Sequence, residues 1–205
     1  MQRHLLFFIL LSTVLAHGQV QEFGRQRHEF STRNGVSFGT GHVFGFAQDR
    51  KFYTMAFRYG FRFRTIKGVT LRYTAEAVPV AVLGEPYFEG RPILGSPIQD
   101  TEWQYIYGGG LNPIGIQMNF RSGKRLQPVL DSNGGFLYFT QRVLSPEASQ
   151  FNFTVHVGLG VQIFSSERHA ITGAFRYHHL SNANISQRNP GTDALMLDLR
   201  FSWFR

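Results

Sequence analysis

The chain of 205 residues contains no cysteine. This absence excludes a disulfide framework, a thiolate metal site and a cysteine nucleophile. The mean hydropathy is −0.17, and no stretch reaches the roughly 18 apolar residues of a membrane-spanning helix, so a helical membrane protein is excluded as well. The sequence contains instead 21 Phe, 8 Tyr and 22 Gly. This enrichment in aromatic residues and glycine is typical of all-β proteins, including transmembrane barrels.

The N-terminus has the pattern of a targeting segment. A short polar start precedes a mainly apolar run over Leu5–Leu15, and small residues that suit a cleavage site follow around Ala16. The run is too short to cross a bilayer as a helix, so it indicates a secretory signal peptide. We therefore expect residues 1–18 to be a signal peptide and residues 19–205 to form one exported barrel domain.

Strict alternation of apolar and polar residues defines the expected strands. Within 53–63, every second residue is aromatic or methionine, and the residues between are polar or small. Period two places these sets on opposite faces of a β-strand. Eight segments can be placed, each long enough for a tilted transmembrane strand: 29–40, 51–63, 69–82, 103–120, 128–139, 151–164, 170–185 and 193–204. In the fourth, the alternation changes phase at Asn112-Pro113, which predicts a bulge or bend.

The connections alternate between short turns and longer loops, as they do in outer-membrane barrels. The short turns are 64–68, 121–127 and 165–169, and the loops are 41–50, 83–102, 140–150 and 186–192. Large aromatic rings fit poorly inside a narrow barrel but suit a surface that faces lipid. The sequence thus predicts an all-β fold, an eight-stranded antiparallel transmembrane β-barrel. A soluble, lipocalin-like barrel, with the two faces reversed, is the alternative.

The opposite set of faces carries charged residues that would line the interior. Arg58, Arg72, Arg176 and Glu76 belong to this set. An eight-stranded barrel is normally filled by side chains, so we expect a structural ion-pair network and no pore. The net charge is +8, and many of the basic residues outside this set fall in the short turns.

The end of the seventh segment holds residues that suit ester hydrolysis. His179 and Ser181 are two positions apart and so share one face of a strand. Asp193 opens the next antiparallel segment near the same rim. A serine, a histidine and a carboxylate are the residues that nucleophilic hydrolysis requires. By phase, all three belong to the set that faces lipid, near the outer interface of the membrane.

The same stretch resembles a known family, the lipid A 3-O-deacylases of Gram-negative outer membranes. The motif consists of His179-Leu180-Ser181-Asn182-Ala183, then Asn189-Pro190-Gly191, then an acid twelve positions after the serine. The resemblance implies that Ser181 is the nucleophile, His179 the base and Asp193 the orienting acid. Asp193 replaces the usual glutamate and is one methylene shorter.

The resemblance also implies the reaction and its partners. Asn189 matches an oxyanion-hole position, the backbone amide of Asn184 is a second candidate donor, and Asn182 conforms to the motif. The substrate would be lipid A or lipopolysaccharide, cleaved at the acyl ester of position 3 in the outer leaflet of the outer membrane. No cofactor and no nucleic-acid partner are expected, and a homodimer remains open.

Several neighbouring residues and motifs have a structural interpretation. His178 and His179 are adjacent in a strand and point to opposite faces, so no metal site is expected there. His178 should instead pack in the lumen near His156. Gly108-Gly109-Gly110 lacks the context of a phosphate loop and suggests close strand packing. A non-catalytic small barrel, structural or adhesin-like, is the alternative function.

Overall fold

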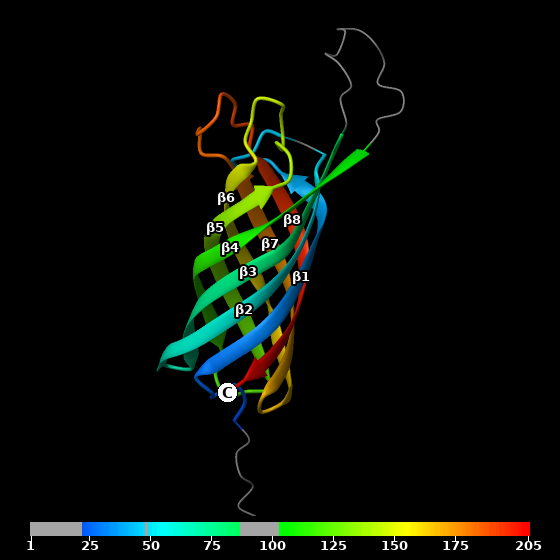
Figure 1. The fold of residues 1–205 in the computed structure, drawn as a ribbon. Helices are drawn as coiled ribbons and strands as arrows, with labels where there is room; N and C mark the ends of the chain where they lie inside the picture. The colour runs from blue at the N-terminus through cyan, green and yellow to red at the C-terminus, as the bar shows by residue number, and fades with distance from the viewer. Residues whose placement is uncertain (1–21, 48, 87–102) are drawn as a thin grey trace, which may run out of the picture.

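Eight antiparallel strands form a closed barrel in which each strand pairs with its neighbours in sequence and β1 pairs with β8 (Figure 1). The computed structural model describes residues 22–47, 49–86 and 103–205. The strands are β1 (His28–Gly41), β2 (Lys51–Ile66), β3 (Val69–Pro86), β4 (Trp103–Phe120), β5 (Leu126–Phe139), β6 (Phe151–Ser166), β7 (His169–Ser181) and β8 (Thr192–Phe204). The predicted signal peptide lies outside the described residues.

The barrel has two unlike ends. Short turns join β2 to β3, β4 to β5 and β6 to β7 at one end, where the C-terminus also lies (Figure 1). We call this the turn end, and the opposite end, where the longer connections gather, the loop end. This confirms the predicted alternation. Among the described residues, no helix is long and apolar enough to span a membrane.

Three predicted strand ends were wrong, and one of them is that of the second strand, which continues to Ile66 instead of ending at 63. The seventh strand stops at Ser181 rather than 185, because Ala183 and Asn184 adopt left-handed backbone conformations with φ of 50° and 63°. Such residues end the pleated geometry of a strand. The third strand continues to Pro86, into the segment expected to be a loop. The predicted irregularity at Asn112-Pro113 is present as a shift in the β4–β5 register between Leu111 and Ile114.

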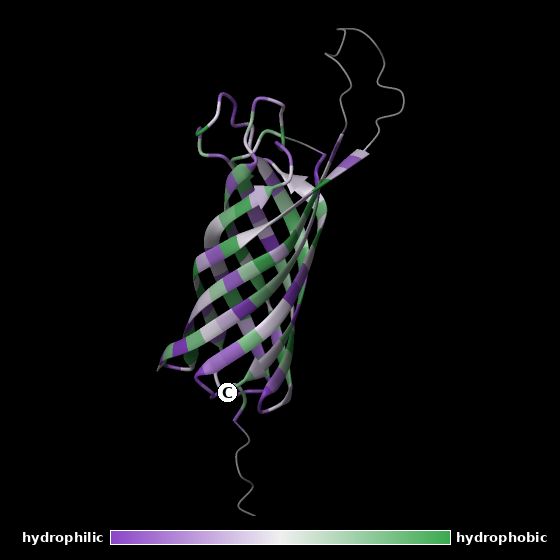
Figure 2. Ribbon diagram, in the orientation of Figure 1, coloured by the Kyte–Doolittle hydropathy of each residue, from purple (hydrophilic) through white to green (hydrophobic). Residues whose placement is uncertain are grey.

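The outer face of the barrel is apolar, as the alternation predicts. Apolar and polar residues alternate over much of the barrel wall (Figure 2), and large side chains such as Phe57, Leu159 and Phe175 are 54%, 63% and 66% exposed. In water this surface would be strongly unfavourable, whereas a bilayer solvates it. The fold is therefore that of an outer-membrane barrel, and the soluble-barrel alternative is wrong.

The lumen is filled by charged side chains that pair with one another. Asp131 accepts hydrogen bonds from Arg58 at 3.0 Å and from Arg200 at 3.1 Å, and Arg176 lies 3.5 Å away. Arg33 bonds to Glu76 at 3.2 Å. All of these side chains are buried. The predicted ion-pair network is confirmed, and it fills the interior with compensated charge.

Two further packing predictions are confirmed. His178 is buried in the lumen with its ring centroid 5.5 Å from that of His156, its partner on β6. The glycine run in β4 lies in close strand contact, because a Cβ on Gly110 would overlap the carbonyl oxygen of Phe136. Both features belong to the packing of the barrel.

Candidate active site

The pairing of β7 with β8 places two of the predicted site residues side by side. His179 and Asp193 are direct partners across the two strands. His179 Nδ1 lies 2.6 Å from Asp193 Oδ1, a short hydrogen bond. The shorter acid therefore reaches the histidine without adjustment, because cross-strand partners already have adjacent Cβ atoms. Ser181, the last residue of β7, is half-buried and lies opposite Phe153 of β6.

Asp193 does not face lipid, and this corrects the prediction from strand phase. It is on the outward face of β8, yet it is fully buried, because the segment Val43–Gly45 lies across it. Its Oδ2 accepts hydrogen bonds from the backbone amides of Val43, Phe44 and Gly45 at 2.8, 2.9 and 3.0 Å. Amide donors to a carboxylate stabilise its charged form. The loop end thus provides an ionised carboxylate, shielded from solvent and aligned with His179.

The two residues after the covering segment, Phe46 and Ala47, hold it to the stretch just before Asp193. Phe46 N donates to Pro190 O at 2.8 Å, and Ala47 N donates to Gly191 O at 3.0 Å. Thr192 Oγ1 donates to Ala47 O at 3.0 Å. Sequence reasoning missed this segment, because backbone donors carry no side-chain signal. Gly45 is the one available hint, since a Cβ there would come within 2.6 Å of Thr192 Cα.

Replacing Gly45 with alanine should therefore weaken the support of Asp193. The added methyl group meets backbone atoms of Thr192, so the segment must move and its three amides shift away from Oδ2. A displacement of about 1 Å near reacting groups can cost on the order of 10²-fold in rate. For the ester hydrolysis that the motif resemblance implies, we expect kcat to fall roughly 10- to 100-fold with little change in KM, measured on detergent-solubilised protein with a lipid ester as substrate.

Gly39→Ala is the matched control, because a Cβ at Gly39 meets nothing within 4 Å. It should retain full activity. Folding of both variants is checked by the heat-dependent gel mobility of the barrel. Equal activities in two folded variants would show that the Val43–Gly45 amides are dispensable.

The His179 side chain lies between the ring of Phe44 and the backbone at Gly191. Its ring makes an edge contact with Phe44, with centroids 5.7 Å apart. Gly191 has φ of 56°, and a Cβ there would lie 3.3 Å from His179 Cε1. The His179 side chain is 17% exposed. Within the part of the chain that the structure describes, neither its Nε2 nor Ser181 Oγ makes a hydrogen bond.

The loop after Ser181 is organised by Asn182, which is buried. Its Nδ2 donates to Ser186 Oγ and to Arg188 O, both at 2.7 Å. Its backbone amide donates to Asn189 Oδ1 at 3.0 Å. Because Oδ1 of Asn189 is the acceptor, Nδ2 of that residue remains to donate elsewhere.

The same network uses the second predicted oxyanion donor. The backbone amide of Asn184 donates to Asn182 Oδ1 at 3.0 Å. This amide would have to leave its partner before it could bind an oxyanion. Among the described residues, no group of three His, Asp or Glu side chains could hold a metal ion.

Comparison with known proteins gives a family and a fold. No curated protein sequence matches the chain. The crystal structure of the outer membrane enzyme PagL has a TM-score of 0.50 and 16% identity, over 84% of this chain and 97% of that one. The outer membrane protein OprG from Pseudomonas aeruginosa has a TM-score of 0.51 and 11% identity, over 89% and 97%. The model of one protein family, described as lipid A 3-O-deacylase (PagL), matches residues 53–202. Since this match covers well over half of the sequence, the chain belongs to the lipid A 3-O-deacylase family.

Proposed function

We propose that the protein is a serine esterase that hydrolyses the acyl ester at position 3 of lipid A, with Ser181 as nucleophile, His179 as base and Asp193 as orienting acid. The observation that carries this proposal is the hydrogen bond of 2.6 Å between His179 Nδ1 and an Asp193 carboxylate whose other oxygen accepts three amides. An acid that fixes the base in this way is the arrangement that serine hydrolysis uses.

The reaction proceeds in two halves. Ser181 Oγ attacks the ester carbonyl while its proton passes to His179 Nε2, and the Nδ1 proton stays hydrogen-bonded to Asp193. The tetrahedral intermediate then expels the sugar 3-oxygen, which takes the proton from His179 and leaves as a hydroxyl. In the second half, water deprotonated by His179 attacks the acyl-serine, and Ser181 Oγ leaves with that proton as the fatty acid is released. No cofactor takes part in either half.

The negative charge of the intermediate needs preorganised donors. Asn189 is the side chain we assign to this role, because its Oδ1 is occupied by Asn182 N and its Nδ2 is therefore oriented as a donor. The amide of Asn184 becomes a second donor if it exchanges its bond to Asn182 Oδ1 for the oxyanion. Asn182 is a positioning residue, since it shapes the loop that carries Asn189.

The proposed location is the outer membrane of a Gram-negative bacterium, reached by export with the signal peptide of residues 1–18. The turn end then faces the periplasm and the loop end faces outward. This orientation places Ser181, His179 and Asp193 near the outer leaflet. Phe44 of the covering segment contacts His179 and is 65% exposed, and Phe46, just after the segment, is 82% exposed; acyl chains of a lipid substrate would lie against these rings.

Mass spectrometry of lipid A tests the proposal. Cells that produce the protein should yield lipid A lacking one acyl chain at position 3, and cells that produce Ser181→Ala should yield unmodified lipid A. Both proteins must reach the membrane in equal amounts, as shown by immunoblotting of membrane fractions. Identical acylation in the two strains would favour the alternative, a non-catalytic structural or adhesin-like barrel.

A further inference from the structure

The positive charge of the protein is concentrated at the turn end. Two acidic residues, Glu22 and Glu167, lie there together with ten basic ones. The ten are Arg25, Arg27, Arg62, Arg64, Lys67, Arg121, Lys124, Arg125, Arg168 and Arg205. The excess equals the formal net charge of the whole chain, +8. The lumen contains five arginines and four carboxylates, and the described residues of the loop end carry four basic and four acidic side chains.

Few of these cations are neutralised within the protein. Among the ion pairs of the described residues, the one at this end joins Arg25 to Glu22. By contrast, every arginine of the lumen lies within 4.0 Å of a carboxylate. Uncompensated charge of one sign on a surface creates a field that attracts counter-ions or a charged partner.

The basic residues directly adjoin the lipid-facing surface. At the strand ends and turns that join β2 to β3 and β4 to β5, a basic residue is the sequence neighbour of an exposed apolar residue four times. The pairs are Phe63–Arg64, Ile66–Lys67, Phe120–Arg121 and Arg125–Leu126, with the apolar members 37–50% exposed. Long basic side chains at such a boundary extend from the apolar region to the level of lipid head groups.

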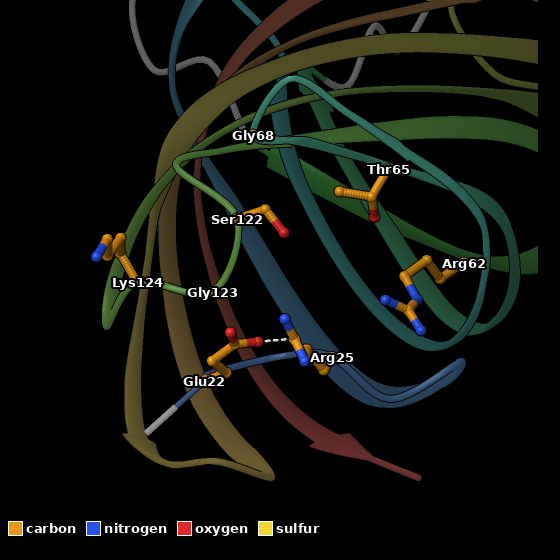
Figure 3. A pocket seen from close by; sticks show the side chains of 8 residues that line it. All are labelled: Glu22, Arg25, Arg62, Thr65, Gly68, Ser122, Gly123 and Lys124. Atoms are coloured by element: carbon orange, nitrogen blue, oxygen red, sulfur yellow. Dashed lines mark ion pairs between the residues drawn. The ribbon is translucent and has the colours of Figure 1, made fainter. Parts of the chain in front are cut away.

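The mouth of the barrel at this end is hollowed (Figure 3). The cavity has a volume of about 430 Å³ and is lined by Arg25, Arg62 and Lys124, by the hydroxyls of Thr65 and Ser122, and by Glu22, whose carboxylate is paired with Arg25. The two turns that border it are joined by a hydrogen bond of 2.8 Å from Ser122 N to Gly68 O. Cations and hydroxyls together suit phosphate oxygens.

We propose that the turn end binds the phosphate head groups of anionic phospholipids in the inner leaflet of the membrane. Head-group phosphates lie at the depth where the exposed apolar residues give way to the basic ones. An anionic lipid has a net charge that a zwitterionic lipid lacks, so anionic lipids should be enriched around the turn end. This interaction is independent of the esterase site at the loop end and depends on the orientation of the barrel alone.

Trp203 provides a local reporter for this enrichment. It is 45% exposed on β8 at the turn end, and the only other tryptophan, Trp103, begins β4 at the loop end. Its neighbourhood contains two of the basic residues, since Phe204 N donates to Arg168 O at 2.8 Å and Arg205 follows in sequence. In a Trp103→Phe protein, the fluorescence therefore reports lipid contact at the turn end.

The experiment compares quenching by brominated phosphatidylglycerol and by brominated phosphatidylcholine, at equal mole fraction in phosphatidylcholine vesicles. We expect phosphatidylglycerol to be preferred at Trp203 roughly twofold to fivefold at low ionic strength. Arg168→Gln/Arg205→Gln should reduce this ratio toward one. High salt should also reduce the ratio in the Trp103→Phe protein that keeps both arginines, because exposed charges are screened.

Lys51→Gln/Arg142→Gln is the matched control, with two cations removed at the loop end, and it should keep the full preference. Equal quenching by the two lipids in the Trp103→Phe protein would overturn the proposal. An equal loss of preference in the control and in Arg168→Gln/Arg205→Gln would also overturn it. The salt dependence is measured without the arginine substitutions, so the proposal can be refuted even if Arg168→Gln/Arg205→Gln fails to fold.

Discussion

Replacing Asp193 with asparagine is expected to lower the rate of lipid A deacylation by about 10⁴-fold, the loss seen when a serine hydrolase loses its triad carboxylate in this way. The three amides of Val43, Phe44 and Gly45 would hold the asparagine oxygen in the place of Oδ2. The NH₂ group would then face His179 Nδ1. His179 would have to accept there and carry its proton on Nε2, so it could no longer accept the proton of Ser181.

The measurement is the turnover of purified lipid A by detergent-solubilised protein, with heat-dependent gel mobility as the check of folding. Asp193→Glu is the conservative comparison, because it keeps the charge and restores the acid usual in the family. The longer side chain must displace the Val43–Gly45 segment, so we expect its rate to lie between those of the wild type and Asp193→Asn. A folded Asp193→Asn protein with a rate within tenfold of the wild type would contradict the proposed role of Asp193.

Replacing Asp131 with alanine should destabilise the barrel by about 3–5 kcal/mol, the usual cost of removing one partner from a buried ion pair. Asp131 accepts from Arg58 and Arg200 and lies close to Arg176. Without it, three buried guanidinium groups lose a shared acceptor in a lumen that water cannot readily fill. The effect should appear as a large drop in the urea concentration at the midpoint of unfolding, followed by tryptophan fluorescence in lipid vesicles.

Glu147→Ala is the control for this change. Glu147 is an exposed carboxylate in the loop between β5 and β6, where it accepts a hydrogen bond from Ser145 Oγ at 2.9 Å. Removing an exposed carboxylate of this kind should leave the urea midpoint of unfolding essentially unchanged. If Asp131→Ala were as stable as this control, the lumenal ion pairs would contribute nothing to the fold.

Much of the barrel could be predicted from residue order, because strand faces repeat with period two. The alternation at 53–63 was enough to place Phe57 outward and Arg58 inward, and both are found there. Strand ends were harder to predict. The end of β7 depends on the left-handed conformations of Ala183 and Asn184, which lie in a turn closed by the bonds of Asn184 N and Ile185 N to Asn182.

For the site, the sequence by itself determined which side chains could meet. His179 and Ser181 share a strand face, and the loop from β7 to β8 sets Asp193 opposite His179. Only the tertiary structure decided the environment of that acid. Strand phase assigned Asp193 to the lipid-facing set, whereas the Val43–Gly45 segment, about 150 positions away in sequence, covers it with three amides. The physical reason is that phase reports the direction of a side chain from its own strand, while burial depends on whatever another part of the chain lays over it.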